Sequence, residues 1–144
     1  MTDLPDRLAD RLAIERLNQD FCHELDRGTP EGFAALFTLD TVYTRGERRS
    51  DGRAEVLAFA RGRISGGPRT SRHFCSGLRI VFEGEERATG ISCCVTYAAS
   101  AVPPIASTAP VLVADFHDLY VRQDGRWLFA ERRIVPVFTP ADAP

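Results

Sequence analysis

The chain of 144 residues contains no lysine, and all 18 of its basic side chains are arginines. The absence of lysine excludes a Schiff-base intermediate and a lysine general base. There is also no apolar run of about 18 residues or more, so no membrane-spanning helix is expected. The N-terminal segment Met1–Arg7 lacks the apolar stretch of a secretory signal peptide. We therefore expect a cytoplasmic protein.

A large excess of charge of one sign is lacking as well. The 18 basic and 20 acidic residues give a formal net charge of −2, which provides no electrostatic reason to expect nucleic acid or an anionic membrane as a partner. The chain has no glycine-rich phosphate loop and no pair of ligands at metal spacing such as His-x-x-x-His. We expect no cofactor, no metal, and a small molecule as substrate.

Cysteine is present but not in a pattern that indicates a disulfide framework or a zinc site, because none of the four residues forms a Cys-x-x-Cys pair. Cys93 and Cys94 are adjacent in a predicted strand and so should point to opposite faces. We interpret Cys22, Cys75, Cys93 and Cys94 as small buried hydrophobic residues rather than as catalytic groups.

The first half of the chain has helical periodicity. Apolar residues at three- and four-residue spacings predict a helix from Pro5 to about Asp26, ended by Gly28. Thr29 as N-cap and Pro30 at the first helical position predict a short second helix. A short strand and a third helix are expected next, over residues 41–45 and 53–64.

After Pro68 the pattern changes to alternation, which is typical of strands. Hairpin turns are expected at residues 83–86 and at 123–125. Helices followed by an antiparallel meander predict an α+β fold, a cone-shaped barrel in which three N-terminal helices close the concave face of a curved antiparallel sheet. We expect one domain over 1–144, with a loose tail from 138 to 144. The predicted strands lie near 70–83, 87–100, 110–122 and 126–137.

Three polar groups stand in segments that otherwise have the composition of a core: Asp26, His73 and Arg132. Burying a charge is costly unless it is paired, so three groups that could pair form a candidate proton-transfer site. Each also has a structural interpretation, as a capping acid, a strand histidine and a buried ion pair. Alternation places Arg132 on the face opposite Trp127 and Phe129, although a bulge would turn Arg133 inward instead.

The order of these segments resembles the SnoaL-like branch of the nuclear transport factor 2-like superfamily. The resemblance covers nearly the whole chain and is carried by the following segments: Leu25-Asp26, Phe33-Ala34-Ala35-Leu36-Phe37, Gly52 before the third helix, Arg72-His73-Phe74, and Asp124-Gly125-Arg126-Trp127. It implies a cone-shaped α+β barrel. Scytalone dehydratase, a bile-acid dehydratase and hexachlorocyclohexane dehydrochlorinase, which the chain is similar to, use an aspartate–histidine dyad inside the cone. The resemblance implies this role for Asp26 and His73, and a site arginine at Arg132.

The chain departs from these enzymes at their substrate-polarising positions, so none of the three substrates is carried over. The positions that hold a lysine, a tyrosine, a second histidine and an asparagine in one or other of them correspond here to Phe21, Leu25, Ala98 and about Phe116.

Further candidate substrate contacts are Tyr43, Phe21, Phe74, Asp115 and His117. Asp115 and His117 alternate on one strand face and could project into the cone as an acid, a base or a substrate contact. Tyr43 could supply a phenol, although tyrosine is also common in strands for packing reasons.

Two classes of function are open. One is a cofactor-free lyase, dehydratase-like, or an isomerase, with His73 as general base, Asp26 orienting it and Arg132 binding the substrate. The other is a non-catalytic ligand-binding or assembly domain on the same fold. The family usually assembles through the convex sheet face, where Trp127 and Phe129 are expected, so we predict a homodimer or homotrimer.

Overall fold

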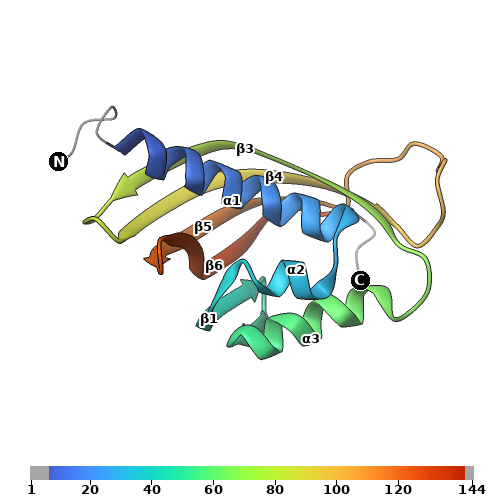
Figure 1. The fold of residues 1–144 in the computed structure, drawn as a ribbon. Helices are drawn as coiled ribbons and strands as arrows, with labels where there is room; N and C mark the ends of the chain where they lie inside the picture. Colours follow the sequence, from blue (N-terminus) through green and yellow to red (C-terminus); the bar gives the residue numbers. More distant parts are fainter. Residues whose placement is uncertain (1–6, 142–144) are drawn as a thin grey trace.

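Three helices and six strands make up the protein in a computed structural model that describes residues 7–141. All three helices precede the four long strands and lie on one side of the sheet, with α1 crossing its concave face and α2 and α3 beside β1 (Figure 1). The elements are α1 (Leu8–Arg27), α2 (Pro30–Ala34), β1 (Phe37–Arg45), β2 (Arg48–Asp51), α3 (Arg53–Ile64), β3 (Thr70–Phe82), β4 (Arg87–Ala99), β5 (Leu112–Gln123) and β6 (Arg126–Phe138).

Local signals determine the helix ends. Thr29 caps α2, since its hydroxyl accepts a hydrogen bond from the Gly32 amide at 3.0 Å, and Pro30 follows at the first helical position. Helix α1 ends just before Gly28 and is described from Leu8 onward; the predicted start at Pro5 lies outside the described residues. No helix within residues 7–141 is long and apolar enough to cross a membrane.

The sheet has the strand order β2-β1-β6-β5-β4-β3. Its last four strands pair antiparallel, which confirms the predicted meander. Strand β1 lies parallel to β6 and forms a hairpin with β2, so the sheet is mixed and open. The short strand predicted over residues 41–45 is the C-terminal part of β1, and β2 was not predicted. The α+β fold class is confirmed. Of the predicted loose tail, Phe138 belongs to β6, and residues 142–144 lie outside the described part.

The hairpin between β5 and β6 sets which side chains of β6 face the interior. Asp124 and Gly125 both have left-handed backbone angles, φ 52° and 76°, as a two-residue turn of this kind requires. Farther along, Tyr120 pairs with Phe129 but Leu119 pairs with Glu131, so one residue of β6 bulges out of register.

This bulge at Ala130 corrects the prediction for Trp127 and Phe129. Phe129 is fully buried before the bulge and Arg132 is fully buried after it, whereas Arg133 is exposed. A simple alternation would have placed Phe129 and Arg132 on opposite faces. Trp127 is only 6% exposed, and its indole donates a hydrogen bond to Asp10 of α1 at 2.8 Å. Neither aromatic residue therefore forms an exposed patch.

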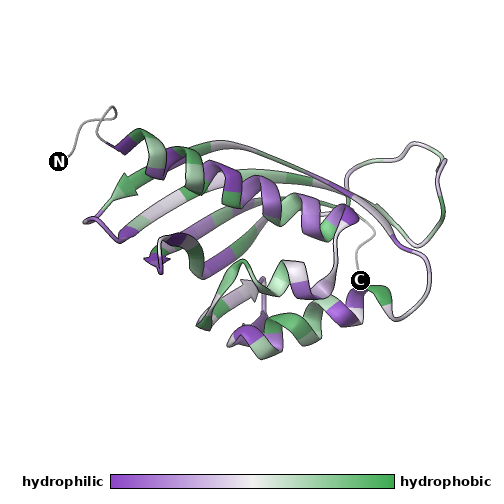
Figure 2. Ribbon diagram, in the orientation of Figure 1, coloured by the Kyte–Doolittle hydropathy of each residue, from purple (hydrophilic) through white to green (hydrophobic). Residues whose placement is uncertain are grey.

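The core lies between the helices and the concave face of the sheet. Polar and apolar residues alternate along α1 and the strands, as expected for elements with one buried side (Figure 2). Its centre is aromatic: Phe21 of α1 packs edge-on against Phe129 and Phe116, with ring centroids 5.9 and 5.7 Å away. This packing holds α1 across β5 and β6, next to the polar residues described below.

Candidate active site

Asp26 and His73 meet where the end of α1 crosses the start of β3. His73 Nδ1 lies 2.6 Å from Asp26 Oδ1, and the His73 backbone amide donates to Asp26 Oδ2 at 2.8 Å. The Ser71 hydroxyl donates to Oδ1 at 2.8 Å. Because an ionised carboxylate can only accept, the proton sits on Nδ1 and the lone pair on Nε2. Among the described residues, none is hydrogen-bonded to Nε2.

Burial and hydrogen bonding act on Asp26 in opposite directions. The two side chains are about equally enclosed, at 8% exposed for Asp26 and 9% for His73. Burial raises the pKa of Asp26, but the hydrogen bonds from His73 and Ser71 outweigh it and lower the pKa below its usual value. Asp26 is therefore ionised near neutral pH and can balance the charge of a protonated imidazole.

His73 lines a cavity of about 380 Å³ on the concave side of the sheet, with mostly apolar walls and four arginines. Phe21 of α1, Tyr43 of β1 and Phe116 of β5 form part of its wall. A mostly apolar hollow of this size with a few polar groups is typical of a small-molecule site. His73 also borders a larger hollow of about 650 Å³ between α1 and β3, whose wall includes the polar side chains of Glu15 and Gln19.

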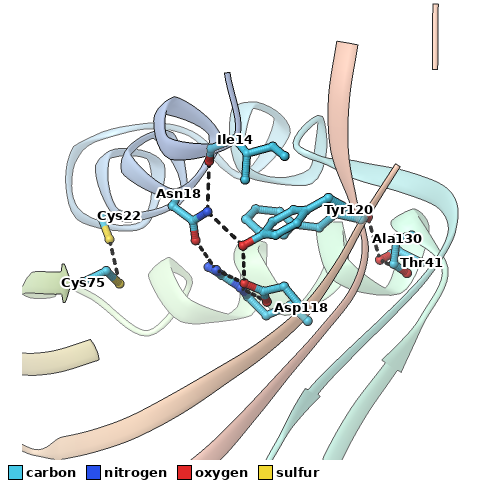
Figure 3. A network of polar contacts seen from close by, with 10 residues as sticks. Ile14, Asn18, Cys22, Thr41, Cys75, Asp118, Tyr120 and Ala130 are labelled. Atoms are coloured by element: carbon cyan, nitrogen blue, oxygen red, sulfur yellow. Dashed lines mark hydrogen bonds and ion pairs between the residues drawn. The ribbon is translucent and has the colours of Figure 1, made fainter. Parts of the chain in front are cut away.

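Arg132 belongs to a separate, buried polar cluster. Figure 3 shows its other members, Asn18, Asp118 and Tyr120. Nε and Nη2 of Arg132 donate to the two carboxylate oxygens of Asp118 at 2.7 and 2.8 Å, and Nη2 also donates to the side-chain oxygen of Asn18. The Tyr120 hydroxyl donates to Asp118 at 2.7 Å and accepts from the Asn18 amide at 3.1 Å. The cluster thus joins α1 to β5 and β6.

Aromatic rings enclose the guanidinium of Arg132. Its central carbon lies 4.2–4.4 Å from the ring centroids of Phe21, Phe116 and Phe129, and the side chain is 0% exposed. Burial alone would lower the arginine's pKa, but Asp118 raises it, so Arg132 stays charged. Arg132 does not line the cavity that contains His73. This geometry therefore does not place Arg132 in direct contact with a substrate in that cavity, contrary to the prediction from the sequence. One of its nitrogens, Nη1, has no partner among the described residues.

Of the remaining predicted substrate contacts, some lie on the concave face of the sheet and others on the opposite face. Phe21 and Tyr43 reach the cavity, and burial raises the pKa of Tyr43 to about 12, so its phenol stays protonated. Asp115 and His117 do not reach it, because they alternate with Phe116, which does; His117 lines a hollow on the opposite face of the sheet.

Phe74 lies on the other side of β3 from the cavity of about 380 Å³. It alternates with His73 on β3, is 59% exposed, and packs edge-on against Tyr97 at 6.2 Å on the outer face. It does not line the cavity of about 380 Å³, but it borders the hollow of about 650 Å³ together with His73.

Three of the four free cysteines gather near the dyad. Cys75 lies two residues after His73 on β3 and is paired in register with Cys94 on β4, and its sulfur is 3.3 Å from that of Cys22 on α1 (Figure 3). Cys94 is buried and Cys93 points to the other face, as the alternation predicts. Within residues 7–141, no group of three His, Cys, Asp or Glu side chains is arranged to hold a metal ion.

Comparison with known proteins identifies the family to which the chain belongs. The model of the SnoaL-like domain matches residues 6–133. The chain belongs to the SnoaL-like domain family. No curated protein matches.

Solved structures similar to this SnoaL-like domain share its nuclear transport factor 2-like fold. A protein of unknown function from Mycobacterium tuberculosis is 25% identical, with a TM-score of 0.81 over 99% of this chain and 80% of that one. A putative scytalone dehydratase from Novosphingobium aromaticivorans is 24% identical (TM-score 0.80; 95% and 96% covered). A hexachlorocyclohexane dehydrochlorinase is 21% identical (TM-score 0.74; 99% and 98% covered).

The sequence prediction for this SnoaL-like domain missed Asn18, Asp118 and Tyr120. One signal was present: Asp118 and Tyr120 continue the alternation of Ala114 and Phe116 on the inward face of β5. Counted from the Asp-Gly turn, however, Arg132 would pair with His117. Only the bulge on β6 shifts Arg132 to Asp118, and the sequence does not reveal that bulge.

Proposed function

We propose that this SnoaL-like domain is a cofactor-free lyase or isomerase in which His73 abstracts a proton from a small, largely apolar substrate. The observation that carries the proposal is the hydrogen bond of 2.6 Å between His73 Nδ1 and Asp26, with Nε2 left without a described partner and His73 lining an apolar cavity. Similarity in fold to a putative dehydratase and a dehydrochlorinase supports the same class of reaction.

The proposed step is an elimination or a proton shift. Nε2 of His73 takes a proton from a carbon next to an electron-withdrawing group, and the released electron pair forms a carbon–carbon double bond as the leaving group departs. If the leaving group is hydroxide, the imidazolium returns the proton and water leaves. If the proton is instead returned to another carbon, the product is an isomer. Asp26 fixes the tautomer and balances the imidazolium.

Arg132 enters the proposal as a positioning residue. Its ion pair with Asp118 fixes β5 against β6, and its contact with Phe21 fixes the part of α1 that forms the cavity wall. A direct polarising role would depend on Nη1, the only nitrogen of its guanidinium without a described partner. Tyr43 and Phe21 are proposed as apolar substrate contacts.

The test is turnover of a panel of β-hydroxy and β-halo ketones, followed by enone absorbance, together with deuterium incorporation from D₂O followed by NMR. On any substrate found, His73→Ala should reduce turnover by roughly 10²-fold or more, which is the usual size of general-base catalysis. Asp26→Asn should have a loss of similar size, and the double variant should lose little more, because the two residues act as one unit.

His23 offers a matched control, since it is the other histidine near the dyad in sequence but makes no described hydrogen bond to Asp26. His23→Ala should retain turnover. If His73→Ala keeps near-full activity, or only lowers the melting temperature, the site is structural and the ligand-binding interpretation of the fold is favoured.

A further inference from the structure

One end of the cavity that contains His73 is strongly cationic. Four arginines line it, from four different segments: Arg45 on β1, Arg48 on β2, Arg63 at the end of α3, and Arg69 just before β3. Within residues 7–141, no aspartate or glutamate lines the same cavity. Some arginines elsewhere are paired with an acid even at the surface, as in Arg61 with Glu31 at 2.9 Å.

Arg45 is half-buried and lacks an anionic partner among the described residues. Its guanidinium donates only to neutral oxygens, the Tyr43 carbonyl at 3.4 Å and the Ser50 hydroxyl at 3.3 Å. The guanidinium carbon lies 3.9 Å from the ring centroid of Phe59, so one face is covered by an aromatic ring. Its Nε is buried and has no partner in the described part of the chain. Burial lowers the pKa of Arg45, which expresses the cost of leaving this charge without a counter-charge.

Arg63 is the second enclosed cation of the group. Its Nη1 donates to the carbonyl of Leu25 at 3.2 Å, which places it beside the residue that precedes Asp26. Burial and the neighbouring charge of Arg69 lower its pKa. Arg48 and Arg69 are exposed and lie at the same cavity, so they add positive charge without compensating it.

A partly desolvated guanidinium is costly unless an anion neutralises it. We propose that the substrate is an organic acid, whose carboxylate binds Arg45 and Arg63 while its apolar body lies against Phe21 and Phe116 next to His73. This inference rests on the proposed function, since it names the substrate class of the same site. A carboxylate matches the planar fork of a guanidinium, which donates two parallel hydrogen bonds to it.

The experiment is calorimetric binding of three acid–amide pairs of equal shape: benzoate and benzamide, 2-naphthoate and 2-naphthamide, and biphenyl-4-carboxylate and its amide. For at least one pair the acid should bind about tenfold tighter or more, because a hydrogen bond to an ionised group is roughly twice as strong as a neutral one. The preference should shrink as sodium chloride is raised from about 0.05 M to about 0.5 M, since salt screens exposed charges most strongly.

Substitution identifies the arginines that matter. Arg45→Gln and Arg63→Gln should each remove most of the preference for the acid, and Arg45→Lys should retain part of it. Arg61→Gln is the matched control on α3, because Arg61 is exposed and pairs with Glu31 away from the cavity. It should leave the preference unchanged. Melting curves of each variant establish that it is folded.

Equal affinity for acid and amide in all three pairs, or a preference that survives in both Arg45→Gln and Arg63→Gln, overturns the inference. If those two variants do not fold, the acid–amide difference and its salt dependence in the unmodified protein still decide. Repeating the measurement with His73→Gln separates the two proposals: the preference for acids should persist there, whether or not any turnover is found. If neutral compounds are turned over and acids are not preferred, the proposal of His73 as general base stands and the proposal of an organic acid as substrate is refuted.

Discussion

Replacing Asp118 with asparagine should destabilise the protein strongly. The carboxylate of Asp118 receives two hydrogen bonds from Arg132 and one from Tyr120, and both members of the ion pair are 0% exposed. Asparagine keeps the shape but removes the charge. The guanidinium of Arg132 is then left buried without a counter-charge.

The expected cost follows from that isolation. Breaking a buried ion pair by removing one partner costs about 3–5 kcal/mol. For a chain of this length each kcal/mol lowers the melting temperature by roughly 2–4 °C, so we expect a decrease of roughly 6–20 °C. The three phenylalanine rings around the guanidinium soften the penalty only in part, since a cation–π contact is worth up to about 2 kcal/mol when desolvated.

The assay is urea unfolding followed by circular dichroism, with Asp115→Asn as control. Asp115 is on the same strand but faces outward and makes no described ion pair, so its substitution should cost less than about 0.5 kcal/mol. The double variant Asp118→Leu with Arg132→Met should lose much less unfolding free energy than its two single variants lose in sum, because it removes both charges at once. Equal effects of Asp118→Asn and Asp115→Asn would refute this account of the cluster and reopen a direct substrate role for Arg132.

Three further outcomes are expected. Hydrogen bonds outweigh burial and lower the pKa of Asp26 in the folded protein. The stabilisation that Asp26 provides is therefore present above the unfolded-state pKa of 3.8 and is lost as the pH falls through the folded-state pKa. The difference in unfolding free energy between the wild type and Asp26→Asn, measured by urea titration, should shrink below about pH 4. Gly90→Ala should destabilise by about 1–3 kcal/mol in the same assay, because the added Cβ would lie 2.7 Å from the ring of Tyr120. The protein should sediment as a dimer or trimer through its convex face, where Ile91 and Val81 are 42% and 61% exposed, and Ile91→Glu should shift it toward monomer; a wild-type monomer at micromolar concentration would contradict this.

Most of the fold could be predicted because its signals are local. The Thr29-Pro30 start of α2 and the Asp124-Gly125 turn depend on a few neighbouring residues, and the alternation after Pro68 extends over long strands. The parallel pairing of β1 with β6 was not predicted, since it joins segments about ninety residues apart and no turn encodes it.

The candidate site was predictable where residue type and family resemblance agreed, and not where strand register decided the facing. Asp26 and His73 each had a structural interpretation when taken alone; their occurrence together in apolar segments and the resemblance to SnoaL-like enzymes identified them as a pair, and they lie 2.6 Å apart. Phe129 was assigned to the wrong face because a single bulge reverses the alternation, and the same bulge selects Asp118 as the partner of Arg132. Asp115 and His117 were expected in the cone because nothing in the sequence chose between the two faces of β5.

The buried charges give the two proposals a common basis. Asp118 is matched to Arg132, and Asp26 is available to the imidazolium that forms when His73 takes a proton. With both interior carboxylates assigned, Arg45 and Arg63 are the enclosed charges at the cavity that form no ion pair with a described acid, although Asp26 is near enough to Arg63 to raise its pKa in part. A neutral substrate would leave them uncompensated during the reaction. An organic acid would neutralise them. The same guanidinium groups would then stabilise the additional negative charge that develops on the substrate as His73 removes the proton.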